Sequence, residues 1–184
     1  SPATARSAGI GAASLFPSSE VSELVDHYGD QLGPYTRFLA YWHLGRHPGM
    51  IERLAADNVG SRQAKVFQRL APLIESQLTR ALSLTEAGRD RAMARLREEL
   101  DAAGSRLGDR DYLCGDRFTA ADLTFGALLA PVLCITPEEG FGAILPELAS
   151  LDDEARALIS EVRAHRAGQF ALRIYGEERR RCQG

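Results

Sequence analysis

A helix start in the second half of the chain constrains the fold more than any other feature of the sequence. Thr119 is a residue type that caps helix N-termini, and Asp122 stands three positions later, where its carboxylate is expected to reach back to the Thr119 amide. Phe118 and Leu123 occupy the two positions of a hydrophobic staple, which fixes the angle at which the chain enters a helix. Residues 123–135 carry no charge. The sequence therefore predicts a helix that is apolar on every side and buried at the centre of a larger helical body.

The rest of the chain also predicts helices. Residues 1–17 are rich in Ser, Ala and Gly and are expected to form a linker or arm, with residues 18–184 as one domain. No alternation typical of β-strands appears, so the expected fold class is all-α. Apolar spacing indicates five helices beside the central one. The first starts at Ser18-Ser19, is kinked at Gly33-Pro34 and stops before Pro48-Gly49. The others are expected at 61–81, at 86–107 and, as a pair, after a loop at 136–151.

Composition argues against several classes of function. The net charge of −3 gives no reason to expect nucleic acid as a partner, and the uncharged run is too short to cross a membrane, which takes about 20 residues. The three cysteines have no metal-ligand or disulfide spacing, which favours a cytoplasmic location. His43 and His47 lie four residues apart, but no third ligand is evident, so no metal site is predicted.

The segment Tyr112–Asp122, a tight turn at Gly115 followed by the capped helix, resembles the "yLxGdxfTxAD" motif of the glutathione S-transferase superfamily. The resemblance extends to Ala130-Pro131 and to the tail at Arg166–Tyr175, and it covers roughly residues 15–180. It implies the C-terminal all-helical domain of that superfamily, a bundle around a buried central helix. Members usually activate the glutathione thiol with an N-terminal thioredoxin-like domain, and this sequence shows neither its sheet nor its cis-proline loop.

In that superfamily, the helical domain supplies much of the wall of a hydrophobic substrate pocket. Arg37, Phe38, Tyr41 and Trp42 cluster beyond the kink of the first long helix and are the expected substrate-binding residues, with Arg37 placed to meet an anionic group such as a glutathione carboxylate. Core packing is the alternative for Trp42, which follows the apolar stripe. No catalytic residue is predicted, and Thr119 and Asp122 are assigned a structural capping role.

Three functions remain open at this point. The first is glutathione conjugation to a small apolar electrophile, with glutathione as cosubstrate and no covalently bound cofactor, if a thioredoxin-like domain completes the protein. The second is a stand-alone helical module that binds a ligand or a protein partner without catalysis. The third is a diverged remnant without activity. The resemblance also implies a possible homodimer.

Overall fold

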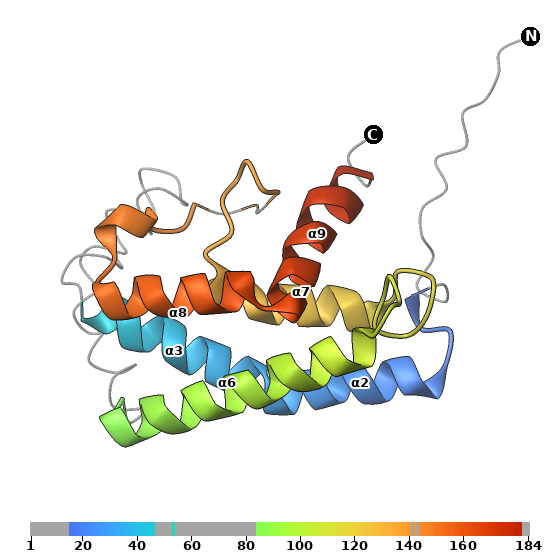
Figure 1. Cartoon of the computed structure of the whole chain (residues 1–184), viewed down its shortest axis with the longest axis horizontal. Coiled ribbons are helices and arrows are strands. Elements are labelled where there is room, and N and C mark those ends of the chain that lie inside the picture. Colours follow the sequence, from blue (N-terminus) through green and yellow to red (C-terminus); the bar gives the residue numbers. More distant parts are fainter. Residues whose placement is uncertain (1–14, 47–52, 54–83, 141, 143, 182–184) are drawn as a thin grey trace, which may run out of the picture.

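The computed structural model describes residues 15–46, 53, 84–140, 142 and 144–181, and within these ranges every regular element is helical (Figure 1). This confirms the all-α fold class. The elements are α2 (Ser19–Gln31), α3 (Gly33–Gly45), α6 (Glu86–Leu107), α7 (Ala120–Leu133), the short 3-10 helix η1 (Leu148–Ser150), α8 (Asp153–Ala164) and α9 (Arg166–Arg181). The helix predicted at 61–81 lies outside the described residues, as does most of the arm predicted at 1–17.

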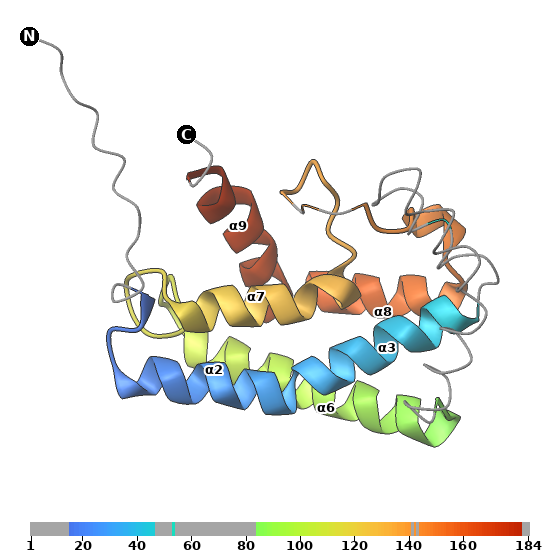
Figure 2. The ribbon, with the colours of Figure 1, turned by 180° about the vertical axis from the view of Figure 1, so that it is seen from behind.

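The first long helix is divided in two at Leu32. Pro34 has no amide hydrogen to donate and occupies the first turn of α3, where a helix leaves such donors unpaired anyway. Leu32 bridges the break, because its amide donates to the Tyr28 carbonyl at 3.0 Å and its own carbonyl accepts from the Thr36 amide at 3.1 Å. Figure 2 shows α2 and α3 running end to end along one side of the molecule. The interruption predicted at Gly33-Pro34 is confirmed.

Helix α6 runs over residues 86–107, as the sequence predicts. The stripe expected to point inward is fully buried, and its members are Ala92, Leu96, Leu100, Ala103 and Leu107. Thr85 caps the start of this helix by accepting a hydrogen bond from the Gly88 amide at 3.1 Å. Helix α6 packs against α3 and α9. The spacing of apolar residues was therefore sufficient to orient this helix.

Helix α7 is the centre of the bundle and packs against α2, α3, α8 and α9. Phe125 lies in the middle of the core, with its ring 5.1 Å from the ring of Tyr28 on α2 and 6.2 Å from the ring of Phe170 on α9. The expectation that α7 is buried on every side is wrong, however. Leu123 is half exposed, and Ala127 and Pro131 on the same side of the helix are also exposed. One apolar stripe of α7 therefore faces outward.

Helices α8 and α9 complete the bundle, and they pack against α7 and against each other (Figure 1). Asp152 caps α8 by accepting a hydrogen bond from the Ala155 amide at 2.7 Å. Between α7 and α8, the chain forms a loop that contains η1 and meets the expectation of a loop at 136–151. None of the described helices is both long enough and apolar enough to cross a membrane.

Candidate functional site

The start of α7 is a closed hydrogen-bonded network. The Asp122 carboxylate is fully buried and accepts hydrogen bonds from the Thr119 amide at 2.7 Å, the Thr119 hydroxyl at 2.8 Å and the Leu113 amide at 2.8 Å. Burial raises the pKa of Asp122, and these three bonds to the carboxylate oppose that shift. Because the carboxylate is enclosed and fully engaged, it is not available to a substrate. Its geometry is that of a capping group that also ties the preceding turn to the helix.

The end of α7 contributes to an apolar cavity of about 130 Å³. Four segments supply its walls, which are almost entirely hydrocarbon. The lining residues are Ala40, His43 and Leu44 of α3; Pro131, Val132 and Cys134 at the end of α7; Leu145, Pro146 and Leu151 of the following loop; and Ala155, Leu158 and Ile159 of α8. A cavity of this size and lining has room for a single aromatic ring, since apolar cavities of about 150 Å³ bind benzene.

Two polar side chains reach this cavity. His43 is buried, and its Nδ1 lies 3.8 Å from the Oδ1 of Asp152, the residue that caps α8. Cys134 donates its thiol hydrogen to the Pro146 carbonyl at 3.3 Å. Burial raises the pKa of the Cys134 thiol, so the protonated form dominates at neutral pH. The cavity therefore offers shape and apolar surface, with a histidine at its edge, rather than a ready nucleophile.

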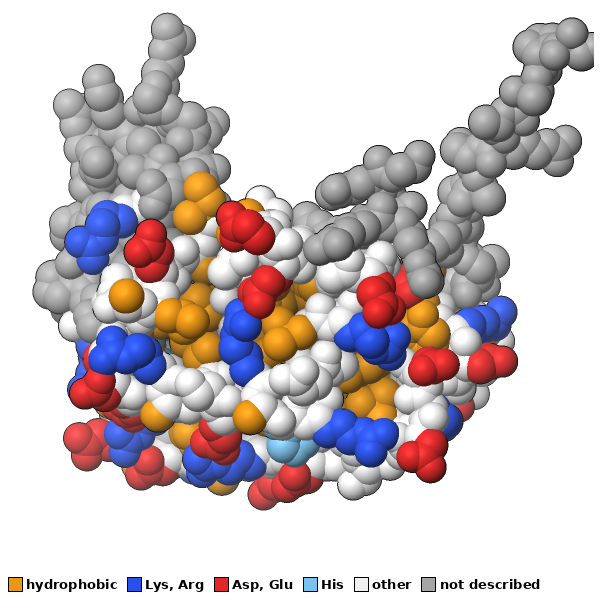
Figure 3. All heavy atoms as spheres, turned by 45° about the horizontal axis from the view of Figure 1, so that its top comes forward, with side chains coloured by type: hydrophobic (Ala, Val, Ile, Leu, Met, Phe, Trp, Pro, Cys, Tyr) orange, Lys and Arg blue, Asp and Glu red, His pale blue; other side chains and the backbone are white. Residues whose placement is uncertain are grey.

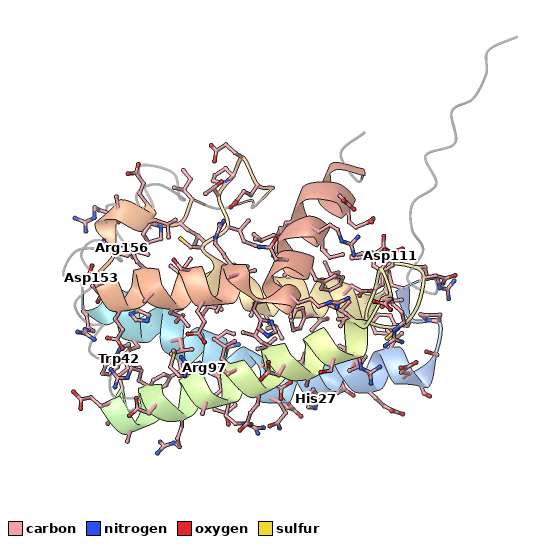
Figure 4. The ribbon with its side chains drawn as sticks, in the orientation of Figure 1. His27, Trp42, Arg97, Asp111, Asp153 and Arg156 are labelled. Atoms are coloured by element: carbon pink, nitrogen blue, oxygen red, sulfur yellow. The ribbon has the colours of Figure 1, made fainter. Side chains whose placement is uncertain are left out.

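A charged cluster joins α3, α6 and α8 at the same end of the bundle. Glu154 on α8 binds Arg46 at 2.7 Å and Arg89 at 2.8 Å, and both guanidinium groups stack over the Trp42 ring, at 5.5 and 5.7 Å from its centroid. Figure 4 shows Trp42 at this end, where α3 lies beside α6. Charged side chains of both signs are interspersed across the face in Figure 3, with apolar side chains between them.

The predicted substrate-binding residues do not line this cavity. Phe38 packs on α6, where a Cβ built on Gly88 would lie 2.7 Å from its ring, and Trp42 lies in the charged cluster between the two arginines. Arg37 is exposed and Tyr41 is partly buried. The structure thus brings Phe38 and Trp42 to the side of α3 that faces α6, whereas the cavity is on the side that faces α8. The assignment of these four residues to a substrate site stays a prediction.

Among the described residues, burial shifts the pKa of two thiols and of one phenol away from ionisation at neutral pH. Burial raises the pKa of Cys114, as it does that of Cys134, and it strongly raises the pKa of Tyr28, whose hydroxyl is therefore protonated at any physiological pH. Among the described residues, no group of three or more His, Cys, Asp or Glu side chains is arranged to hold a metal ion. By its lining, the cavity between α3, α7 and α8 suits an apolar group rather than a charged one.

The cavity residues were missed because they come from four segments. Ala40, His43 and Leu44 do share one face of α3 at helical spacing, and this face differs from the one that carries Phe38 and Trp42. That spacing could have indicated a second apolar face. Nothing in the sequence shows that α8 and the loop at 145–151 cover this face incompletely, because the gap results from the way the helices pack.

Residues 86–133, which are α6, the following turn and α7, match the family model described as glutathione S-transferase, C-terminal domain. The resemblance inferred from Tyr112–Asp122 is confirmed over this range, which is roughly a quarter of the chain. No curated protein and no solved structure matches the chain significantly.

Proposed function

Because residues 86–133 are a segment of a glutathione S-transferase C-terminal domain, we propose that this chain is the ligand-binding half of a glutathione S-transferase-like protein. It binds a small, uncharged apolar electrophile in the cavity between α3, α7 and α8. Conjugation of glutathione to that electrophile takes place when a thioredoxin-like domain supplies the thiol-activating group. The observation that carries the proposal is the apolar lining of the cavity, within a fold of this family.

The outward stripe of α7 supports the need for a second domain. Leu123 is 50% exposed, and Ala127 and Pro131 extend the stripe along one side of the central helix of the bundle. An apolar stripe on a central helix is typical of a surface that another domain covers. Arg37, exposed on α3, remains the candidate for contact with a glutathione carboxylate, and a homodimer in the cytoplasm remains part of the proposal.

The second candidate is a stand-alone binding module. It is favoured by one observation, namely that this chain alone forms the cavity, from α3, α7, α8 and the loop between the last two. The two candidates predict the same ligand but differ in catalysis. The purified chain is expected to leave a generic aromatic electrophile and glutathione unreacted under both, and clear turnover would contradict the assignment of activation to another domain.

Fluorobenzene is the probe for the cavity, because it has one ring, no charge and a fluorine signal for NMR. We expect the chain to bind it with a Kd on the order of 1 mM, about −4 kcal/mol. Ala155→Leu should abolish binding by filling the cavity, since Ala155 is buried in its wall. Ala40→Leu fills it from the opposite wall if the first variant unfolds.

Ala157→Leu is the matched control for the cavity-filling variants. Ala157 lies on the same helix, α8, but is exposed, so the added side chain extends into solvent and binding should be unchanged. Circular dichroism would verify that each variant is folded. If the wild-type chain does not bind fluorobenzene, or if both filled variants bind it as the wild type does, the proposed site is wrong.

A further inference from the structure

The chain segment that ends α7 and lines the cavity is held by one side chain from α8. Arg163 donates from Nε to the Leu133 carbonyl at 2.8 Å and from Nη2 to the Cys134 carbonyl at 3.1 Å. These carbonyls belong to the last turn of a helix, where intrahelical partners are missing. Arg163 therefore supplies the C-terminal cap of α7 from a residue that lies about 30 positions later in the sequence.

The same guanidinium group forms a bidentate ion pair with the loop. Its Nη1 lies 2.8 Å from the Oε1 of Glu139, and its Nη2 lies 2.7 Å from the Oε2. Glu139 also accepts a hydrogen bond from the Thr136 amide at 2.9 Å. A planar guanidinium matches a carboxylate in this two-point geometry, which fixes direction as well as distance. One side chain thus binds both the helix end and the loop that leaves it.

The backbone between these two contacts is in a conformation that needs support. Cys134 has φ 49° and ψ 54°, which is the left-handed region that only glycine adopts at low cost. Its carbonyl accepts a hydrogen bond from Arg163, and its thiol donates a hydrogen bond to the Pro146 carbonyl on the far side of the loop. Such a conformation persists where the surroundings determine it. Arg163 is therefore placed to keep Cys134 and Pro146 in the cavity wall.

We propose that Arg163 is a positioning residue for the ligand cavity: it does not line the cavity, but it holds the end of α7 and the following loop in the arrangement that gives the cavity its shape. The inference rests on the proposed function insofar as the cavity binds a ligand. A site whose walls are fixed by surrounding hydrogen bonds loses affinity when those bonds are removed, even if the fold persists.

The test compares two arginines that each pair with a carboxylate on another segment of the chain. Arg163→Met removes the bonds to α7 and the loop. Arg97→Met is the matched control, because Arg97 on α6, labelled in Figure 4, binds Glu161 on α8 at 2.6 Å. Arg97 is not among the residues that line the cavity. Fluorobenzene affinity is measured by fluorine NMR at a temperature where circular dichroism shows each variant folded. We expect Arg163→Met to weaken binding about tenfold and Arg97→Met to leave it within about twofold.

A second measurement does not depend on ligand binding. Methyl methanethiosulfonate labels cysteine thiols, and mass spectrometry of peptides reports the rate at Cys134 alone. We expect about a tenfold faster rate in Arg163→Met than in the wild type, and no change in Arg97→Met. Glu139→Gln keeps the side-chain shape, and in both assays it should give values between those of the wild type and Arg163→Met. It replaces Arg163→Met as the test variant if Arg163→Met does not fold.

The outcomes separate the two proposals. If the wild-type chain does not bind fluorobenzene but Cys134 labelling still accelerates in Arg163→Met, the ligand site is wrong while Arg163 does hold the cavity wall. If the wild type binds and neither affinity nor labelling differs between Arg163→Met and Arg97→Met, the positioning role is overturned.

Discussion

The two ends of α7 are built in different ways. At the N-terminal end, Thr119 and Asp122 lie three residues apart, and the amide and hydroxyl of Thr119 donate hydrogen bonds to the Asp122 carboxylate. The Leu113 amide in the preceding turn donates the third hydrogen bond to the same carboxylate. At the C-terminal end, Arg163 caps the helix from about 30 residues away and the chain turns through a left-handed Cys134. The first end is local and fully buried. The second is tertiary, partly exposed and adjoins the cavity, so we expect the first to govern stability and the second to govern binding.

The largest expected effect is that of Asp122→Ala at the N-terminal end. The substitution leaves the amides of Leu113 and Thr119 buried without an acceptor, and we expect a loss of about 4 kcal/mol in the free energy of unfolding, measured by urea denaturation. Asp116→Ala in the same turn removes an exposed carboxylate and should cost less than about 0.5 kcal/mol. A loss below about 1.5 kcal/mol for Asp122→Ala would show that this end does not dominate stability.

The next effect compares two glycines with positive φ, one on each side of α7. Gly140 has φ 103°, and a Cβ added there would lie 2.6 Å from the Tyr175 carbonyl oxygen on α9. Gly115 has φ 118° but open space around it. We expect Gly140→Ala to cost about 3 kcal/mol, since backbone strain and a clash add, and Gly115→Ala about 1 to 2 kcal/mol from strain alone. Thermal unfolding of the two variants measures the difference. Equal losses in the free energy of unfolding would mean that the backbone at Gly140 does not pack closely against α9.

The smallest effect is a pH dependence at the C-terminal end. Hydrogen bonds from Arg163 hold the pKa of Glu139 below its ordinary value, so the folded state binds this proton less readily than the unfolded state does. The resulting stability is present above the ordinary pKa and is lost as the pH falls through the lowered one. The pair is partly exposed, so its contribution is below about 1 kcal/mol.

The measurement is the free energy of unfolding of the wild type and of Glu139→Gln at several pH values. The difference should be largest near pH 7 and should shrink between about pH 5 and pH 3. In an Arg163→Met background, Glu139→Gln should alter the pH dependence less, because the main group that lowers the pKa is gone and only the Thr136 amide still does so. An effect of Glu139→Gln on the pH dependence that is undiminished in that background would show that Arg163 does not set the pKa of Glu139.

Much of the fold could be predicted because the signals are local. The inward stripe of α6, from Ala92 to Leu107, follows from helical spacing, and the break at Leu32 follows from the proline two residues later. The candidate site could not be predicted in the same way. The cluster of aromatic side chains beyond the kink drew attention to Phe38 and Trp42, which pack towards α6, while the opposite face at Ala40 and Leu44 borders the cavity.

The sequence by itself determined where α7 starts, since Thr119 and Asp122 interact across a single helical turn and need no other part of the chain to do so. The same sequence, with no charge between residues 123 and 135, left open which side of α7 faces outward. Only the tertiary structure decided that Leu123, Ala127 and Pro131 are exposed and that Arg163 caps the other end. The physical reason is that helix periodicity and capping act over three or four residues, whereas cavities and distant caps depend on how whole helices pack.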